Sequence, residues 1–99
     1  MKLKSTKIVK VPNGKLLRVD VEFDKKNILN VKITGDFFLH PENTIELFEK
    51  KIKQIPTKFD CDKLIRTLNK IAVDNKAQLI GITTRDIIKT LEEAINAKS

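Results

Sequence analysis

The sequence contains no tryptophan and no tyrosine, and its five aromatic side chains are all phenylalanines. Surfaces that stack nucleic-acid bases interleave aromatic rings with basic side chains, and these phenylalanines are not interleaved with the lysine clusters. Only three glycines are present, which excludes a glycine-rich phosphate loop and a dinucleotide-binding fingerprint. No apolar run approaches the ~20 residues that a membrane-spanning helix needs, and no apolar signal core follows the basic N-terminus.

Cysteine and histidine each occur once. Cys61 has no partner for an internal disulfide, which indicates a reducing, cytoplasmic location. It lies between Asp60 and Asp62 on an apolar helical stripe, so we expect a small hydrophobic side chain rather than a nucleophile. His40 has no neighbouring ligands, whereas metal sites need three or four. We therefore expect no catalytic residue and no metal ligand in this chain.

Positive charge is in excess, with 20 lysines and arginines against 13 acids and a formal net charge of +7. Basic residues neutralise phosphates, so nucleic acid is a candidate partner. One basic group precedes the first acid, Asp20: Lys2, Lys4, Lys7, Lys10, Lys15 and Arg18. A second group lies where the first helix is expected to end, and there it suits the helix dipole: Lys50, Lys51, Lys53 and Lys58. This simpler explanation makes nucleic acid the less favoured partner.

The first third of the chain has the two-residue period of β-strands. Residues 5–11, 15–23 and 28–34 are predicted to be strands, joined by a Pro-Asn-Gly turn at 12–14 and a polar turn at 24–27. In the second strand Leu17, Val19, Val21 and Phe23 share one face, and Leu16 breaks the pattern. Three strands joined by short turns predict an antiparallel meander.

Between the strands and the helices lies a segment with two adjacent aromatic residues. Gly35-Asp36 ends the third strand, and Pro41 stands where a helix could begin. Neighbouring side chains of an extended segment point to opposite faces. We therefore expect one of Phe37 and Phe38 to face the core and the other to face something else.

The rest of the chain has the period of helices. The first helix has Ile45, Phe48, Ile52 and Ile55 on one stripe and stops at Pro56. The second has Asp60 as its N-cap and ends near residues 74–76, and the third begins at Thr83 with Asp86 completing a capping box.

Residues 77–82 are too few to classify by period, and we favour a fourth strand over an extended link. Strands followed by helices indicate one α+β domain over residues 1–99. We expect a three- to four-stranded, mainly antiparallel sheet with three helices packed on one face.

Two motifs carry a resemblance to a known family. The first is Gly14-Lys15-Leu16-Leu17-Arg18-Val19, and the second is Ile33-Thr34-Gly35-Asp36-Phe37-Phe38, followed by Pro41-Glu42. Together they resemble the C-terminal accessory domain of lipoate–protein ligases, which is a separate short chain in some archaea and bacteria. The resemblance runs from about Lys7 through the last helix and is most specific at Gly-Asp-Phe-Phe.

The resemblance implies a non-catalytic accessory subunit that binds the catalytic subunit in trans as a heterodimer. The family activates lipoate with ATP to lipoyl-adenylate and pyrophosphate. It then transfers the lipoyl group to a lysine of a carrier such as an E2 subunit or the glycine-cleavage H protein. Lipoate, ATP and magnesium would belong to the catalytic subunit, and this chain alone would bind no cofactor.

The motif residues are the candidate interface with that partner. They are Gly14, Lys15, Arg18, Gly35, Asp36, Phe37 and Phe38. A buried aromatic anchor would come from Phe37 or Phe38, hydrogen-bond acceptance from Asp36, and favourable charge from Lys15 and Arg18. Simpler roles stay open, because both rings could be core residues and Asp36 could cap a turn.

Two other functions stay open at this stage. A basic nucleic-acid-binding module would explain the charge. A sulfur-carrier or iron–sulfur assembly protein is suggested by fold analogy alone, and it would need a reactive Cys61.

Overall fold

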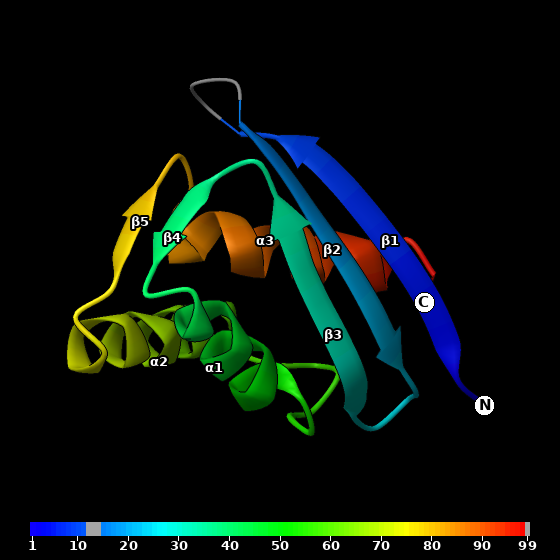
Figure 1. The fold of residues 1–99 in the computed structure, drawn as a ribbon. Helices are drawn as coiled ribbons and strands as arrows, with labels where there is room; N and C mark the ends of the chain where they lie inside the picture. The colour runs from blue at the N-terminus through cyan, green and yellow to red at the C-terminus, as the bar shows by residue number, and fades with distance from the viewer. Residues whose placement is uncertain (12–14, 99) are drawn as a thin grey trace.

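The computed structural model describes residues 1–11 and 15–98 and has an α+β fold (Figure 1). The elements follow in the order β1 (Leu3–Lys10), β2 (Leu16–Phe23), β3 (Ile28–Gly35), β4 (Phe38–His40), α1 (Asn43–Ile52), α2 (Cys61–Asp74), β5 (Gln78–Ile80) and α3 (Thr84–Asn96). The predicted fold class is therefore confirmed. The turn predicted at residues 12–14, including Gly14, lies outside the described residues.

β1, β2 and β3 form the predicted antiparallel meander, with β2 in the centre. Leu17, Val19 and Val21 are buried on the face that meets the helices, as the two-residue period predicts. The pairing of β2 with β3 shifts register at Glu22/Phe23, where Phe23 lies opposite Ile28. Such an irregularity bends a strand locally. At this point the alternation of buried and exposed side chains along β3 is also broken, because Ile28 is fully buried and its neighbour Leu29 is partly buried.

The outer edge of β3 is covered by the segment around the end of α1. The Ile33 amide donates to the Glu49 carboxylate at 2.7 Å, and the Ile28 amide donates to the Ile55 carbonyl at 2.9 Å. The Gln54 amide returns a bond to the Ile28 carbonyl at 2.7 Å. These bonds block a sheet edge that could otherwise pair with another chain.

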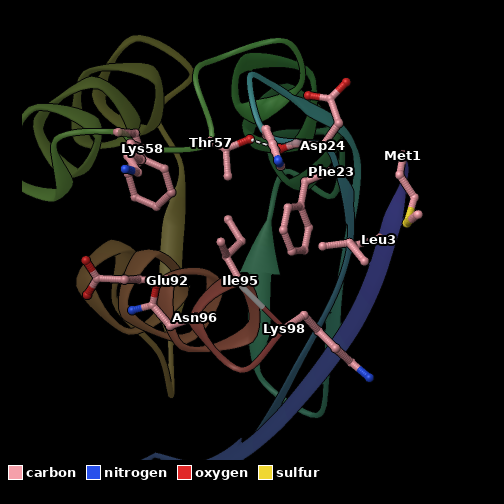
Figure 2. Close-up of a pocket in the computed structure, with 12 residues that line it drawn as sticks. Met1, Leu3, Phe23, Asp24, Thr57, Lys58, Glu92, Ile95, Asn96 and Lys98 are labelled. Atoms are coloured by element: carbon pink, nitrogen blue, oxygen red, sulfur yellow. Dashed lines mark hydrogen bonds between the residues drawn. The ribbon is translucent and has the colours of Figure 1, made fainter.

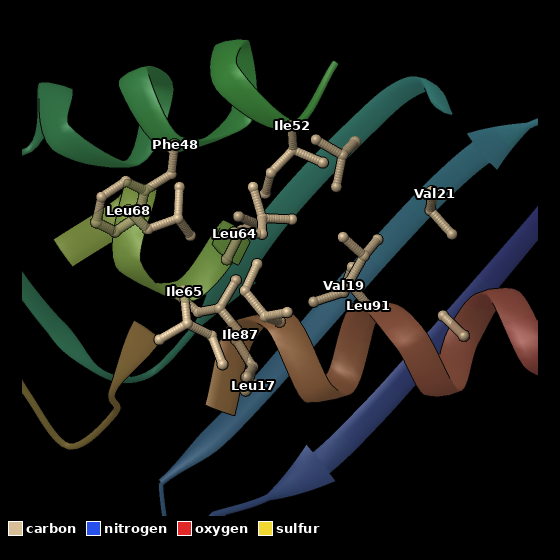
Figure 3. Packing of buried hydrophobic residues seen from close by; sticks show 14 of the residues in the cluster. Leu17, Val19, Val21, Phe48, Ile52, Leu64, Ile65, Leu68, Ile87 and Leu91 are labelled. Atoms are coloured by element: carbon tan, nitrogen blue, oxygen red, sulfur yellow. The ribbon is translucent and has the colours of Figure 1, made fainter. Parts of the chain in front are cut away.

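The helices lie on one side of the meander, as Figure 1 shows. α3 packs on β1 and β2, α1 packs on β3, and α2 packs against the other two helices. Figure 3 shows the resulting core, in which Phe48 and Leu68 meet between α1 and α2 while Leu91 of α3 lies over Val19 of β2. The apolar faces predicted from the helical period are thus the faces that form the core.

The predicted helix caps are present. The Asp60 carboxylate accepts from the Lys63 amide at 3.2 Å. The Thr83 hydroxyl accepts from the Asp86 amide at 3.1 Å, and the Asp86 carboxylate accepts from the Thr83 amide at 2.9 Å. This reciprocal pair is a capping box and fixes where α3 starts.

Two details differ from the sequence-based expectation. The strand favoured within residues 77–82 exists as β5, but it pairs with β4 in a separate two-stranded sheet rather than with the meander. α1 ends at Ile52, before Ile55, because the backbone of residues 54 and 55 pairs with Ile28. The helical spacing of apolar residues therefore extends to Ile55, three residues beyond the end of the helix itself.

Candidate docking site

A hydrogen-bonded clasp joins the start of β2 to the residue after β3. The Leu16 amide donates to the Asp36 carboxylate at 2.6 Å, and the Asp36 amide donates to the Leu16 carbonyl at 3.2 Å. A carboxylate that accepts from a backbone amide makes a stronger bond than a neutral acceptor does. Asp36 therefore closes this end of the sheet within its own chain, which is the simpler of the roles considered for it.

Gly35 is needed at this clasp because the chain is crowded there. A Cβ atom on Gly35 would collide with the Leu16 carbonyl oxygen and would lie 2.8 Å from the Phe37 ring. The carbonyl belongs to backbone that the clasp holds in place, so it cannot easily move aside. Glycine lets two backbones approach more closely than any other residue does.

We expect Gly35→Ala to lower the free energy of unfolding by ~2 kcal/mol or more, because the added methyl group strains the clasp. Urea unfolding followed by circular dichroism measures the change. Thr34→Ala, at the neighbouring half-exposed position of β3, is the matched control and should change stability by less than ~1 kcal/mol. Equal losses for both variants would show that the close approach at Gly35 is not important.

The two adjacent phenylalanines point to different environments, as the sequence analysis expected. Phe37 is partly buried against the core, whereas Phe38 is 51% exposed. The Phe38 ring stacks on His40, with ring centroids 6.2 Å apart and planes 10° from parallel. An aromatic ring held in place but open to solvent can anchor a partner at low conformational cost.

Other apolar side chains are exposed near Phe38. Ile80 pairs with Phe38 in the β4–β5 register and is also 51% exposed, and Leu16 at the clasp is 46% exposed. Lys15 reaches the same place, because its Cγ lies against Gly81, the residue after Ile80. We call Lys15, Leu16, Asp36, Phe38 and Ile80 the Phe38 corner.

Most of the predicted interface residues lie at or next to this corner, but Arg18 does not. It lies further along β2, where its guanidinium pairs with the Asp20 carboxylate at 3.0 Å. A hydrogen bond from Arg18, and to a smaller extent one from Thr6, holds the pKa of Asp20 below its usual range. Arg18 therefore already has an acidic partner within the chain. Gly14, the remaining candidate, lies outside the described residues.

Sequence reasoning missed two residues of the corner. Leu16 carried a signal, because it interrupts an alternating strand and so places an apolar side chain on the outer face. Ile80 carried none, since its place beside Phe38 depends on the pairing of β4 with β5. His40, which the sequence analysis did not expect to be a metal ligand, stacks on Phe38.

Cys61, the only thiol, is not an activated nucleophile. Its Sγ donates to the Glu92 carboxylate at 3.0 Å. Burial, followed by the hydrogen bond and charge of Glu92, raises the pKa of Cys61 to about 11. Thiolate is the reactive form of cysteine, so this environment argues against a sulfur-carrier function.

We expect Cys61 to react slowly with iodoacetamide at pH 8, because a pKa near 11 leaves roughly 100-fold less thiolate than a pKa of 9. The rate should rise about tenfold per pH unit up to pH 10. Mass spectrometry at several pH values measures the rate. Glu92→Gln should accelerate labelling, because it removes a charge that disfavours the thiolate. Labelling at pH 8 as fast as that of an unstructured cysteine peptide would contradict this assignment.

Within residues 1–11 and 15–98, no three histidine, cysteine or acidic side chains gather closely enough to hold a metal ion. None of the three helices in this part of the chain combines the length and apolar composition that crossing a bilayer requires. The arrangement at the Phe38 corner offers apolar surface, one lysine and a satisfied carboxylate. Exposed apolar surface of this kind is common at the centre of protein–protein interfaces.

Comparison with known proteins gives the family. Residues 2–91 match the family model described as the bacterial lipoate protein ligase C-terminus. No curated protein sequence matches the chain. A solved chain from an archaeal lipoylation system, comprising a bipartite lipoate protein ligase and its E2 lipoyl domain from Thermoplasma acidophilum, is 26% identical with a TM-score of 0.75. The match covers 92% of this chain and 97% of that chain. Because the family model spans most of the sequence, the chain belongs to the bacterial lipoate protein ligase C-terminus family.

Proposed function

We propose that this chain is the accessory subunit of a two-chain lipoate–protein ligase. It binds a catalytic subunit in trans as a heterodimer and is required for ATP-dependent formation of lipoyl-adenylate. The catalytic subunit then passes the lipoyl group to a lysine of a carrier such as an E2 lipoyl domain or the glycine-cleavage H protein. Family membership and the likeness to a chain of a bipartite ligase system support this assignment.

The observation that carries the docking proposal is the exposed Phe38 ring. It projects from a corner that the Asp36–Leu16 clasp and the Phe38–His40 stack hold in shape. Ile80, which pairs with Phe38, and Leu16 at the clasp are two further exposed apolar side chains of this corner. Interface anchors are typically rigid aromatic side chains surrounded by contacts that exclude water. We therefore propose that Phe38 is the ring that faces the partner, whereas Phe37 packs against the chain's own core.

The contribution to catalysis is indirect. Adenylation requires the reacting groups to be held in line and water to be kept away from the activated acid. A docked domain can supply both by ordering loops of the catalytic subunit. Lipoate, ATP and magnesium are bound by that subunit, and we place the pair in the cytoplasm. Lys15, beside Gly81, adds positive charge at the corner and would favour a partner that carries a nucleotide.

The test is direct association of the two purified chains, measured by analytical ultracentrifugation and isothermal titration calorimetry. The proposal predicts a complex with one copy of each chain that survives moderate salt. A catalytic subunit that stays separate at micromolar concentration would overturn it. An oligonucleotide titration at low salt is run in parallel. Tight binding with a steep salt dependence would instead favour a nucleic-acid-binding module.

A further inference from the structure

The two outer edges of the meander differ from each other. The edge of β3 is covered, because the Ile28 and Ile33 amides donate to the Ile55 carbonyl and the Glu49 carboxylate. β1 is the outermost strand on the other side, away from α1, as Figure 1 shows. Within residues 1–11 and 15–98, backbone hydrogen bonds join β1 only to β2. A strand of eight residues therefore has one open edge.

The ladder between β1 and β2 shows which backbone groups form this open edge. The Val11 amide donates to the Lys15 carbonyl at 2.9 Å, and hydrogen-bonded pairs recur at every second residue of an antiparallel ladder. The odd-numbered residues of β1 therefore bond to β2. Leu16, an even-numbered residue of β2, bonds to Asp36 on its other side, which agrees with this alternation. Four residues consequently direct their amide and carbonyl groups away from β2: Lys4, Thr6, Ile8 and Lys10.

The inner face of β1 holds the strand in position. Ser5 is buried, and Leu3 and Val9 are partly buried against the core. Figure 2 shows Leu3 beside Phe23, with Ile95 of α3 on a neighbouring side of the same space. A strand that is already ordered loses little conformational entropy when another strand adds to it. The open edge of β1 is thus preorganised for pairing.

The charge on β1 determines which kind of strand can pair with it. Residues 1–11 contain four lysines and no acid. The two acids of β2 on the outer face are already paired, Glu22 with Lys4 at 3.8 Å and Asp20 with Arg18 at 3.0 Å. Lysines on an edge strand discourage pairing with a second copy, because every charge on both strands would be positive. An acidic strand is attracted instead.

The position of β1 indicates where such a strand comes from. Lys10, at the end of β1, lies opposite Leu16 of the Phe38 corner. A partner seated on the corner is therefore next to the open edge. In the part of the chain that the structure describes, neither Lys7 nor Lys10 belongs to an ion pair of 4.0 Å or less. Both lysines are available to acids of that partner.

We propose that an extended acidic segment of the catalytic subunit adds to β1 as a further strand of the meander. About seven residues of the segment span the edge from Lys4 to Lys10. Backbone hydrogen bonds supply affinity, and side chains at alternate positions supply specificity. Acids lie opposite the two lysines, and an apolar residue lies opposite Ile8, which is 56% exposed. The inference rests on the proposed function and names the element of the partner that binds.

The test is amide hydrogen exchange of the ¹⁵N-labelled chain, followed by NMR, alone and with the unlabelled catalytic subunit. Exchange at Thr6 and Ile8, whose amides point away from β2, should slow at least about tenfold in the complex. Exchange at Ser5, Lys7 and Val9, whose amides bond to β2, should change less than about threefold.

Three outcomes of this experiment would overturn the inference. A complex in which Thr6 and Ile8 exchange as in the free chain would overturn strand pairing and leave the proposed function intact. Two chains that do not associate would overturn both proposals. Protection of the same amides in the isolated chain, increasing with its concentration, would place a second copy on the edge instead of the catalytic subunit.

A proline variant tests the backbone pairing separately. Ile8→Pro removes an outward amide and no bond to β2, which is a position where an edge strand tolerates proline. It should weaken binding of the catalytic subunit at least about tenfold, whereas Ile8→Thr keeps the amide and should weaken it less than about threefold. Circular dichroism checks that both variants fold, and the exchange experiment decides without any variant. Equal weakening, or unchanged affinity in both, would overturn strand pairing.

A pair of charge variants tests the acidic character of the segment. The double variant Lys4→Gln, Lys10→Gln should weaken binding about fivefold or more. The matched double variant Lys50→Gln, Lys51→Gln on α1 removes the same charge and should stay within about twofold of the unmodified chain. Equal weakening by both pairs would show only a general charge effect and would overturn the assignment of an acidic strand to β1.

Discussion

Phe38→Ala is expected to weaken binding to the catalytic subunit by ~30-fold or more, which corresponds to about 2 kcal/mol or more for an aromatic anchor. The ring is 51% exposed in the isolated chain, so its removal leaves no cavity in the core. The free energy of unfolding should therefore change by less than ~1 kcal/mol. Isothermal titration calorimetry gives the affinity, and urea unfolding gives the stability.

Val73→Ala is the matched control for Phe38→Ala. Val73 is 75% exposed on α2 and is not part of the Phe38 corner, so its truncation should leave the affinity unchanged within about twofold. Loss of affinity in both variants would point to a general effect on the fold. Unchanged affinity in Phe38→Ala would place the interface elsewhere.

Phe48→Ala is expected to cost ~3–5 kcal/mol of folding stability, the usual loss for a buried phenylalanine. Phe48 has no exposed surface and packs where α1 meets β3 and α2. The whole stability of a domain of this size is about 5–15 kcal/mol, so the variant should be close to unfolding at 37 °C. Urea unfolding at 25 °C measures the loss.

The neighbouring residue Leu47 provides the control for that variant. It is 38% exposed on α1, and Leu47→Ala should cost less than ~1 kcal/mol because part of the side chain is already in contact with solvent. Similar costs for Phe48→Ala and Leu47→Ala would mean that α1 does not pack as described.

The sequence was informative wherever local chemistry determines the structure. Alternation placed Leu17, Val19 and Val21 in the core because successive strand residues face opposite ways. Thr83 and Asp86 marked the start of α3 because they satisfy its first amides. The same alternation rule predicted that Phe37 and Phe38 would separate, and only Phe38 is exposed.

Features that depend on distant partners could not be predicted in this way. The β4–β5 sheet joins two three-residue strands far apart in the sequence, and three residues are too few to show a period. From the sequence alone, Arg18 was expected to offer its charge to a partner protein. In the structure its guanidinium forms an ion pair with Asp20 of the same chain. The Phe38 corner likewise depends on the Asp36–Leu16 clasp, which no local pattern specifies.

Release of pyrophosphate from lipoate and ATP, measured with the catalytic subunit from the same organism, tests the central claim most directly. The account predicts little release by either chain alone. It predicts a rate that rises with the concentration of this chain and saturates when the complex is full. A catalytic subunit that releases pyrophosphate equally fast alone, or release by this chain unaided, would contradict the accessory role.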